Sequence, residues 1–350
     1  MKLSENSSDT INYLKCLLCI GVVFIHTQYW PDVNTACGLS GGGSYIVYNI
    51  VSRFFADNFL GHTCVPLFFC ISGYLFFLNI SESYELSQYK RKIKSRCKSL
   101  LVPYVIANGV MIIAVTLLSV IKNQPIDFFN LLADFWQGEK GGPIDMPTWY
   151  IRDLMVVVVF SPIIFYAIKK SKWFLPVVIL ICWFLNVWWT SVPGLGIRSF
   201  LFFSIGAYFS IAQKDIVVIL KIRKYWPIYV IVYILTLLAS LYYKLSWLGS
   251  ISILLSFPFW ISLAAGMRKL FRYEKCPKSL VTGTFFVFLY HFSLAHRVPV
   301  YLTKIFGYSD ISVTTCYVLG GALTTIFLLT IYYLGRKYFP KIVSVIVGGR

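Results

Sequence analysis

Charged side chains are scarce in this sequence: 13% of its 350 residues are Asp, Glu, Lys or Arg, whereas 58% are hydrophobic. Soluble proteins usually carry about 25% charged residues. Together with a mean hydropathy of +0.71, this shortage excludes a soluble globular domain. The composition indicates an integral membrane protein whose long apolar runs cross a lipid bilayer as helices.

Acidic residues are the rarer charged kind, 14 against 32 Lys and Arg, which leaves a formal net charge of +18. Such an excess can indicate nucleic-acid binding, so the distribution of the charges is decisive. The apolar runs predict an all-α bundle of about ten transmembrane helices. The predicted spans are residues 12–30, 62–80, 99–121, 148–168, 173–190, 198–213, 226–243, 247–267, 280–297 and 311–335.

The basic residues divide unequally between the two sides of this bundle. With the N-terminus in the cytoplasm, 24 of the 32 Lys and Arg lie on the cytoplasmic side together with six acidic residues. The other eight lie outside with eight acidic residues. This is the pattern of the positive-inside rule. We therefore expect both termini in the cytoplasm, loops 31–61 and 122–147 outside, contact with anionic lipid, and no nucleic-acid partner.

Signals for processing and for further domains are missing as well. The first apolar run, Tyr13 to Trp30, has no small-residue cleavage site, so we expect a first span rather than a cleaved signal peptide. No internal repeat or appended soluble domain is evident, which predicts a single membrane domain over residues 1–350. The stretch from Tyr45 to Phe59 has apolar residues at helical spacing, and we expect it to lie flat at the outer interface.

Metal-binding spacings such as C-x-x-C are absent among the nine cysteines, and no metal site is predicted. Most cysteines fall within spans, where a thiol acts as a small apolar group. Cys37 and Cys64 fall near the outer side, where an oxidising periplasm permits a disulfide, and whether they form one stays open. His291 and His296 are separated by about 140° on a helix, so we do not expect a helical metal pair.

Lys15 and His26 lie eleven residues apart in the first predicted span. That spacing places both side chains within about 20° of one helix face and about 16 Å apart along the axis. Ionisable groups inside a membrane are costly and therefore functional candidates. The alternative is that Lys15 extends to the interface as an orientation anchor and His26 merely lies at the opposite interface.

Four motifs follow one another in a definite order. They are Lys15 with His26, VPLFFCISGY at 65–74 followed by the basic segment KSRCKSLLVPY at 94–104, WYIRDL at 149–154, and FLYH at 288–291. Their order and the number of spans resemble the integral membrane acyltransferase-3 family, bacterial enzymes that O-acylate surface glycans and glycolipids. Three features depart from that family. Lys15 stands where Arg is usual, and Asn12 stands where Asp is frequent. Arg96 and Lys98 match an Arg-x-x-Arg signature only loosely.

The resemblance implies an acyltransferase, most simply an O-acetyltransferase, in the bacterial inner membrane. Its donor would be cytoplasmic acyl-CoA, a co-substrate rather than a permanently bound cofactor, and its acceptor a surface glycan or lipid-linked sugar. The cations expected to bind the donor's phosphate groups are Lys15, Lys94, Arg96 and Lys98. The positive-inside rule alone also explains why this loop is basic. Phosphate binding and simple membrane topology therefore both stay open as explanations.

His26 is the expected catalytic base, since a neutral imidazole suits removal of a hydroxyl proton near pH 7. Direct attack of the acceptor and a route through acyl-His26 are both compatible with this role, and His62 is a weaker alternative base. Arg152 and Asp153 form either a local structural pair or a catalytic pair. In the catalytic pair, Arg152 polarises the thioester or orients the acceptor while Asp153 holds a cation or histidine in place.

Three further residues are candidates for substrate binding: Trp149, Tyr150 and His291. The two aromatic residues belong either to an interfacial belt or to a stacking platform for a sugar ring. His291 is either a hydrogen-bonded structural group or part of the outer site. Ser72 and Gly73, adjacent small residues in the second motif, indicate close packing of helices.

A transporter or flippase for a lipid-linked sugar is the main alternative function. It would use the same polar residues but needs alternating access, often built from inverted repeats. The sequence shows no internal repeat, and a transporter or flippase has no evident use for the basic loop. A structural or sensory membrane protein explains neither His26 nor the order of the motifs.

Overall fold

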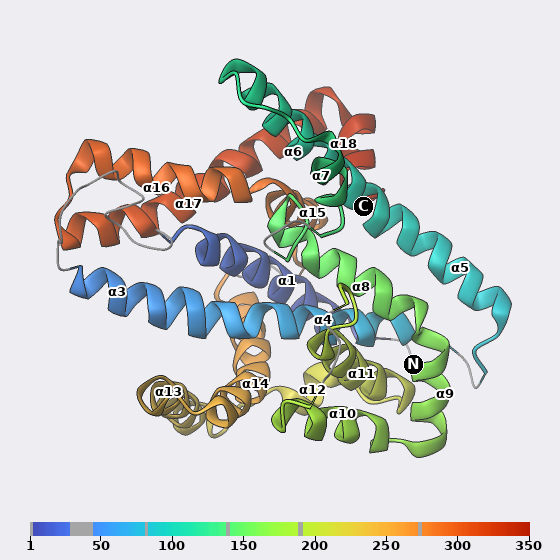
Figure 1. Ribbon diagram of the computed structural model, residues 1–350. Helices are drawn as coiled ribbons and strands as arrows, with labels where there is room; N and C mark the ends of the chain where they lie inside the picture. The colour runs from blue at the N-terminus through green and yellow to red at the C-terminus, as the bar shows by residue number, and fades with distance from the viewer. Residues whose placement is uncertain (1–2, 29–44, 81–82, 138–140, 188–191, 272–274) are drawn as a thin grey trace. The chain divides into compact units, whose positions relative to one another are not determined.

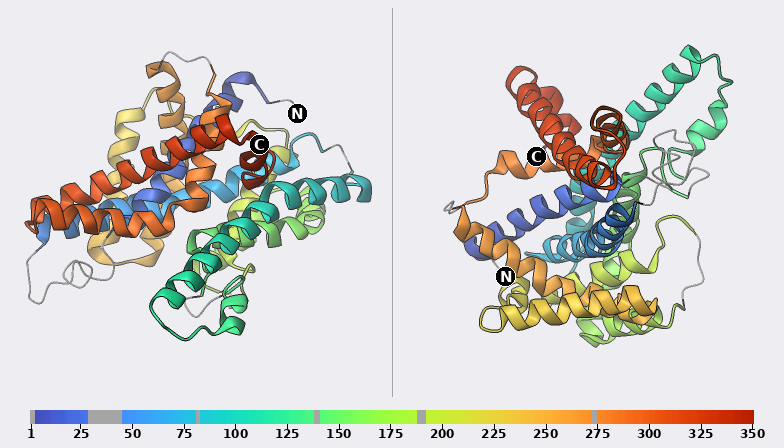
Figure 2. Two further views of the ribbon diagram at one scale, coloured as in Figure 1. Left: turned by 90° about the horizontal axis from the view of Figure 1, so that it is seen from above. Right: turned by 90° about the vertical axis from the view of Figure 1, so that its left-hand side faces the viewer.

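A computed structural model describes residues 3–28, 45–80, 83–137, 141–187, 192–271 and 275–350. All regular elements in these ranges are helical (Figures 1 and 2), in agreement with the predicted all-α class. Cys37, the glycines between residues 38 and 43, and Glu139 fall outside the described residues. The question of a Cys37–Cys64 disulfide therefore stays open, and Cys64 is buried in α4.

Six continuous helices are long and apolar enough to cross a membrane. They are Glu5–His26 (α1), Ile46–Phe77 (α3 Ile46–Ser52, η1 Arg53–Gly61, α4 His62–Phe77), Leu86–Ile121 (α5 Leu86–Arg96, η2 Cys97–Leu101, α6 Val102–Ile121), Trp226–Tyr243 (α13), Ser246–Leu270 (α14) and Asp310–Tyr338 (α17).

Two bent pairs of helices add up to two more spans. Met146–Thr148 (η3) with Trp149–Val159 (α8) meets Ser161–Ser171 (α9) at 61°, and Lys278–Tyr290 (α15) meets Phe292–Phe306 (α16) at 77°. The chain is thus a multi-pass helical protein with six to eight candidate spans among the described residues. The remaining short helices are Phe128–Ala133 (α7), Phe174–Phe184 (α10), Ile197–Ile211 (α11), Ile216–Leu220 (α12) and Pro340–Ile346 (α18).

The count of about ten spans is not confirmed, because two predicted spans correspond to short helices. The predicted span 173–190 corresponds to α10, with 11 residues, and 198–213 corresponds to α11, with 15 residues. A helix that crosses the hydrocarbon core needs about 20 residues. Asn186, shortly after α10, adopts a left-handed backbone with φ of 54°, which does not continue a right-handed helix.

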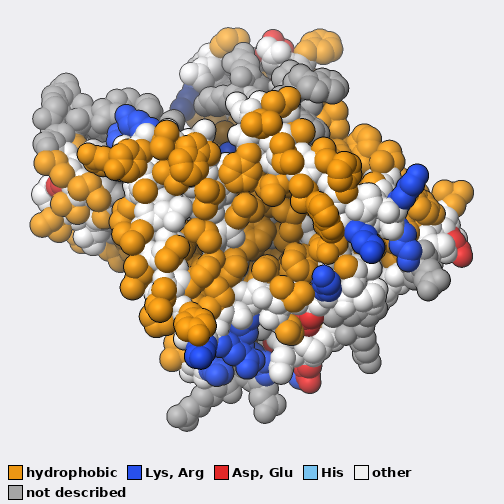
Figure 3. Space-filling view, turned by 90° about the horizontal axis from the view of Figure 1, so that it is seen from below, with side chains coloured by type: hydrophobic (Ala, Val, Ile, Leu, Met, Phe, Trp, Pro, Cys, Tyr) orange, Lys and Arg blue, Asp and Glu red, His pale blue; other side chains and the backbone are white. Residues whose placement is uncertain are grey.

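The described chain divides into two compact units. Unit 1 comprises residues 1–7, 66–219 and 339–350, and unit 2 comprises residues 8–65 and 220–338. The face drawn in Figure 3 is mostly covered by hydrophobic side chains, with Lys and Arg gathered in groups. Such exposed apolar surface is typical of helices that contact lipid rather than water.

In unit 1, α4 and α11 approach so closely that their backbones are in contact. A Cβ at Gly206 would overlap the carbonyl oxygen of Cys70 and lie 2.8 Å from the carbonyl carbon. A Cβ at Gly73 would in turn overlap the carbonyl oxygen of Phe203. Small residues permit this kind of approach between membrane helices. The predicted close packing at Gly73 is confirmed.

In unit 2, α16 and α17 lie side by side, as do α13 and α14 (Figures 1 and 2). The Asp310 carboxylate, at the start of α17, accepts hydrogen bonds from the backbone N–H of Val47 (2.7 Å) and Tyr48 (2.9 Å) in the first turn of α3. From there α3 continues through η1 into α4. Residues 46–59, which we expected to lie at the outer interface, are thus the first part of one continuous helix, Ile46–Phe77.

Candidate functional site

Three of the four histidines lie together in unit 2. His26 is the last residue of α1, and its ring centroid lies 5.3 Å from that of His291 and 6.2 Å from that of His296. The ring of Phe292 meets His26 edge-on at 5.3 Å. His26 and His296 are partly exposed, whereas His291 is completely buried. The structure thus surrounds the predicted base with two further imidazoles.

The break between α15 and α16 is what brings these rings together. α15 ends at Tyr290 and α16 begins at Phe292, with a bend of 77°. The 140° separation expected on a straight helix does not apply across this bend, and both His291 and His296 lie close to His26. The sequence analysis missed His296 as a site residue for this reason. Among the described residues, no group of three or more His, Cys, Asp or Glu could hold a metal ion.

The tautomer of His291 follows from its hydrogen bonds. Nδ1 lies 2.8 Å from the carbonyl oxygen of Phe288 and 3.2 Å from that of Val287. Carbonyl oxygens only accept, so Nδ1 carries the proton and the neutral ring presents a bare Nε2. This Nε2 is buried and has no hydrogen-bond partner among the described residues. A buried acceptor of this kind is available to an N–H or O–H that enters the cluster.

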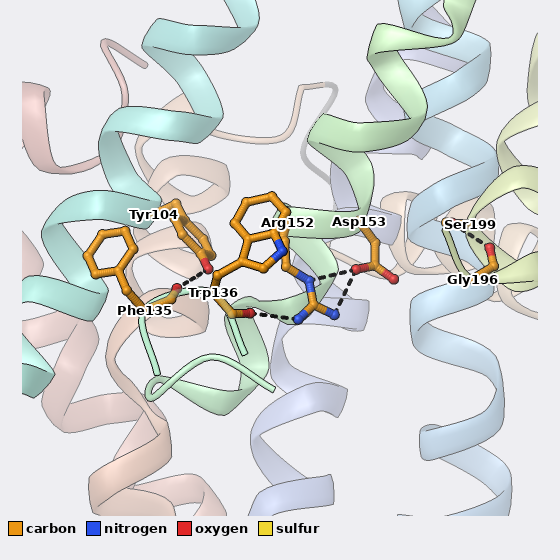
Figure 4. Close-up of polar contacts among 7 residues, drawn as sticks. All are labelled: Tyr104, Phe135, Trp136, Arg152, Asp153, Gly196 and Ser199. Atoms are coloured by element: carbon orange, nitrogen blue, oxygen red, sulfur yellow. Dashed lines mark hydrogen bonds and ion pairs between the residues drawn. The ribbon is translucent and has the colours of Figure 1, made fainter. Parts of the chain in front are cut away.

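Arg152 and Asp153 form a buried pair in unit 1, near the start of α8 (Figure 4). The Nε of Arg152 donates to Oδ1 of Asp153 at 3.0 Å, and its NH2 lies 3.0 Å from the same oxygen. Its NH1 donates to the carbonyl oxygen of Trp136 at 2.8 Å. The two side chains are only 6% and 9% exposed. The predicted pairing exists, and the contact of Arg152 with Trp136 ties α8 to the loop that precedes it.

Asn108, a residue that the sequence analysis missed, fixes the end of that loop. It is completely buried in α6, and its Nδ2 donates to Oγ1 of Thr148 at 3.0 Å. Its Oδ1 accepts from the backbone N–H of Asp145 at 3.1 Å. A polar side chain within an apolar span signals a functional or structural role, so the sequence did contain a signal. Asn108 holds the start of α8, and with it Arg152, against α6.

Asp145 is a second buried carboxyl group at this junction. It is 2% exposed, and its Oδ2 has no hydrogen-bond partner among the described residues. Because burial disfavours the charged form, the pKa of Asp145 rises from its ordinary 3.8 to about 8. The folded protein thus keeps this carboxyl protonated at pH values where the unfolded chain releases the proton.

This raised pKa predicts that stability falls as pH rises. The unfolded chain loses the Asp145 proton near its ordinary pKa and the folded protein only near 8, so the free energy of unfolding falls between these values and then levels off. We expect Asp145→Asn to flatten this dependence and to raise the Tm at about pH 9 by several degrees. Melting curves of the purified protein at about pH 5 and pH 9 measure it. Parallel curves for wild type and variant would contradict it.

Tyr150 and Trp149 take part in the packing of α8 against α4 in unit 1. The hydroxyl of Tyr150 lies 2.9 Å from Oγ of Ser72, and its ring centroid lies 4.7 Å from that of Phe69. Tyr150 is buried and Trp149 is partly exposed. The predicted contact of these two residues with a sugar stays a prediction.

The four cations predicted to bind the donor lie in two different units, and only one of them lines a cavity. Lys15 lies in α1 of unit 2, while Lys94, Arg96 and Lys98 lie in α5 and η2 of unit 1. Arg96 lines a cavity of about 430 Å³, whereas Lys94 and Lys98 are not among its lining residues. Arg91, Lys92 and Arg350, which the sequence analysis did not assign, line the same cavity. This cavity is called the basic pocket below.

The helices, the histidine cluster and the buried Arg–Asp pair define a class of protein: a polytopic helical membrane protein with ionisable side chains buried among its helices. A family model described as an acyltransferase domain, acyltransferase 3, matches residues 9–334. The chain therefore belongs to the acyltransferase-3 family, and the resemblance deduced from the four motifs is confirmed.

One curated relative gives a more specific comparison. The chain is 25% identical over 178 residues to the succinoglycan biosynthesis protein ExoH of Rhizobium meliloti (strain 1021). The match covers 48% of this chain and 45% of that relative, so it spans less than half of each protein. No solved structure matches the chain.

Proposed function

We propose that this protein is a membrane O-acyltransferase. It moves an acyl group, most simply acetyl, from cytoplasmic acyl-CoA to a hydroxyl of a surface glycan or lipid-linked sugar on the periplasmic side of a bacterial inner membrane. The histidine cluster is the observation that carries this proposal, because acyl transfer to a hydroxyl needs a neutral base. Family membership and a relative named for succinoglycan biosynthesis support it.

In the proposed reaction, His26 removes the proton of the acceptor hydroxyl. The hydroxyl oxygen forms a bond to the carbonyl carbon of the thioester, and the bond from that carbon to sulfur breaks. CoA leaves as a thiolate and receives the proton. In the two-step variant, a ring nitrogen of His26 first takes the acyl group and then passes it to the acceptor.

His291 is proposed to orient His26. Its bare Nε2 has no hydrogen-bond partner among the described residues, and the centroid of its ring lies 5.3 Å from that of His26. An N–H of His26 that turns toward this nitrogen leaves the other nitrogen of His26 as the proton acceptor. A second group that fixes the tautomer of a catalytic histidine is a common arrangement in acyl transfer.

Arg152 is proposed to bind oxygen atoms of the thioester or of the acceptor. Its contacts with Asp153 and with the Trp136 carbonyl leave further N–H donors on the guanidinium. Because Asp153 balances the charge and the group is buried, Arg152 is held rigidly. Preorganised donors of this kind stabilise negative charge that develops on a carbonyl oxygen.

Transfer of labelled acetyl groups in membrane vesicles tests the reaction and its sidedness together. Inside-out vesicles expose the cytoplasmic face, so we expect labelled acetyl-CoA added outside them to acetylate the glycan fraction. Sealed right-side-out vesicles should transfer little label, because acetyl-CoA does not cross the bilayer. Transfer only in right-side-out vesicles would contradict the topology. Movement of a lipid-linked sugar without any acyl transfer would support the transporter or flippase.

A further inference from the structure

The basic pocket combines cations from two distant parts of the sequence, both within unit 1. Its volume is about 430 Å³. Its lining residues are Arg91, Lys92, Ser95, Arg96, Ser99 and Arg350. Four of these six are cations, two carry hydroxyls, and none is acidic. The volume lies within the range of small-molecule sites, about 300–1,000 Å³.

A pair of glycines brings Arg350 to the pocket. Gly348 and Gly349 both have φ of +75°, a left-handed conformation that side chains disfavour. A Cβ at Gly348 would lie 2.7 Å from Cα of Ser99, and a Cβ at Gly349 would lie 2.6 Å from Cε of Lys98. The turn therefore lies directly on η2, and NH2 of Arg350 donates to the carbonyl oxygen of Ser99 at 3.2 Å.

The cations from α5 are held in place by the end of α4. The Nζ of Lys92 donates to the carbonyl oxygens of Phe76 and Leu78. It also lies 5.0 Å from the ring centroid of Phe76, and the guanidinium of Arg96 lies 5.5 Å from the same ring. Groups that are already positioned lose less conformational entropy when a ligand binds.

The positive charge of the three α5 cations indicates the chemistry of a ligand. Arg91, Lys92 and Arg96 make no ion pair with a carboxylate among the described residues. Guanidinium and ammonium groups that converge in this way bind phosphate through charge-assisted hydrogen bonds. Several cations around one cavity suit a ligand with more than one phosphate group, such as the nucleotide part of coenzyme A.

We propose that residues 348–350 complete a phosphate-binding pocket, in which Arg350 and the cations of α5 bind the phosphate groups of the acyl-CoA donor. This inference rests on the proposed function, because acyl-CoA is the donor proposed there. The residues proposed to bind phosphate are Arg91, Lys92, Arg96 and Arg350. Lys94 and Lys98 lie outside it.

Coenzyme A binding to the detergent-purified protein tests this assignment. The test variant is Arg91→Gln with Arg350→Gln, and the matched control is Lys90→Gln, which removes an exposed cation of α5 outside the pocket. We expect the double variant to raise the Kd for coenzyme A by about tenfold or more per lost contact. The control should change it less than about twofold. Added salt should weaken wild-type binding more than that of the double variant.

The outcomes separate this inference from the function on which it rests. No coenzyme A binding by the wild type would overturn the proposed donor as well. Binding by the wild type with an unchanged Kd in the double variant would overturn the pocket alone. A second measurement compares the Tm of the protein in phosphatidylglycerol with its Tm in phosphatidylcholine. If the double variant lost only the stabilisation by phosphatidylglycerol and kept coenzyme A binding, the pocket would hold an anionic lipid headgroup instead.

Discussion

His26→Ala should reduce acyl transfer by at least about 100-fold while the protein still folds and inserts into the membrane. General base catalysis contributes about 10²–10⁴-fold. His26 is partly exposed and lies on the predicted Lys15 face of the first span. It ends α1, so truncating its side chain leaves the helix intact. The measurement is the initial rate of label transfer from acetyl-CoA, with the Tm of the purified variant as the folding check.

Two comparisons make the His26 result specific. His62→Ala changes the alternative base and should leave most of the activity. Imidazole added to His26→Ala should restore part of the lost rate, because a small base can occupy the space that the ring leaves. Near wild-type transfer by a folded His26→Ala protein would remove His26 from the catalytic role and direct attention to His62.

Gly206→Val should abolish the accumulation of folded protein. Even the first atom of the new side chain would overlap the carbonyl oxygen of Cys70, and it would lie 2.8 Å from the backbone nitrogen of Tyr74. Backbone atoms cannot move aside without separating α4 from α11, so the cost exceeds the roughly 1–3 kcal/mol of ordinary overpacking. Size-exclusion chromatography of the detergent-solubilised protein should show loss of the monodisperse peak.

Gly109→Val is the matched control for this substitution. A Cβ at Gly109 meets nothing within 4 Å, and this residue also lies in the interior of a long helix. It should therefore accumulate at close to the wild-type level. A Gly206→Val variant with a wild-type chromatogram and Tm would mean that α4 and α11 do not approach in the way described here.

Local sequence pattern predicted much of the helical framework. The first span is predicted at 12–30 and observed at Glu5–His26, and the predicted span 226–243 coincides with α13. In such cases an apolar run of sufficient length specifies a helix by itself. α10 was predicted to be longer, because apolar composition continues past Phe184, where the helix ends. α11 nearly matches its predicted range, 198–213, and both are short for a span.

The candidate site was predicted only where it depends on local sequence. Arg152 and Asp153 are neighbours in the chain, and their pairing was an expected possibility. His296 was missed because helical periodicity cannot anticipate a break that no proline marks at His291. Arg350 was missed because tertiary packing alone brings the end of the chain to α5.

The bend between α15 and α16 has a consequence for mutational scanning. A broken helix leaves backbone groups without intrahelical partners, and hydrocarbon cannot satisfy them. The neighbouring packing must therefore hold the bend, including Pro299 of α16, which lies against Gly320 of α17. A mutational scan limited to polar residues would overlook the apolar residues that hold the bend. Apolar substitutions that straighten the helix should inactivate the protein although every histidine is still present.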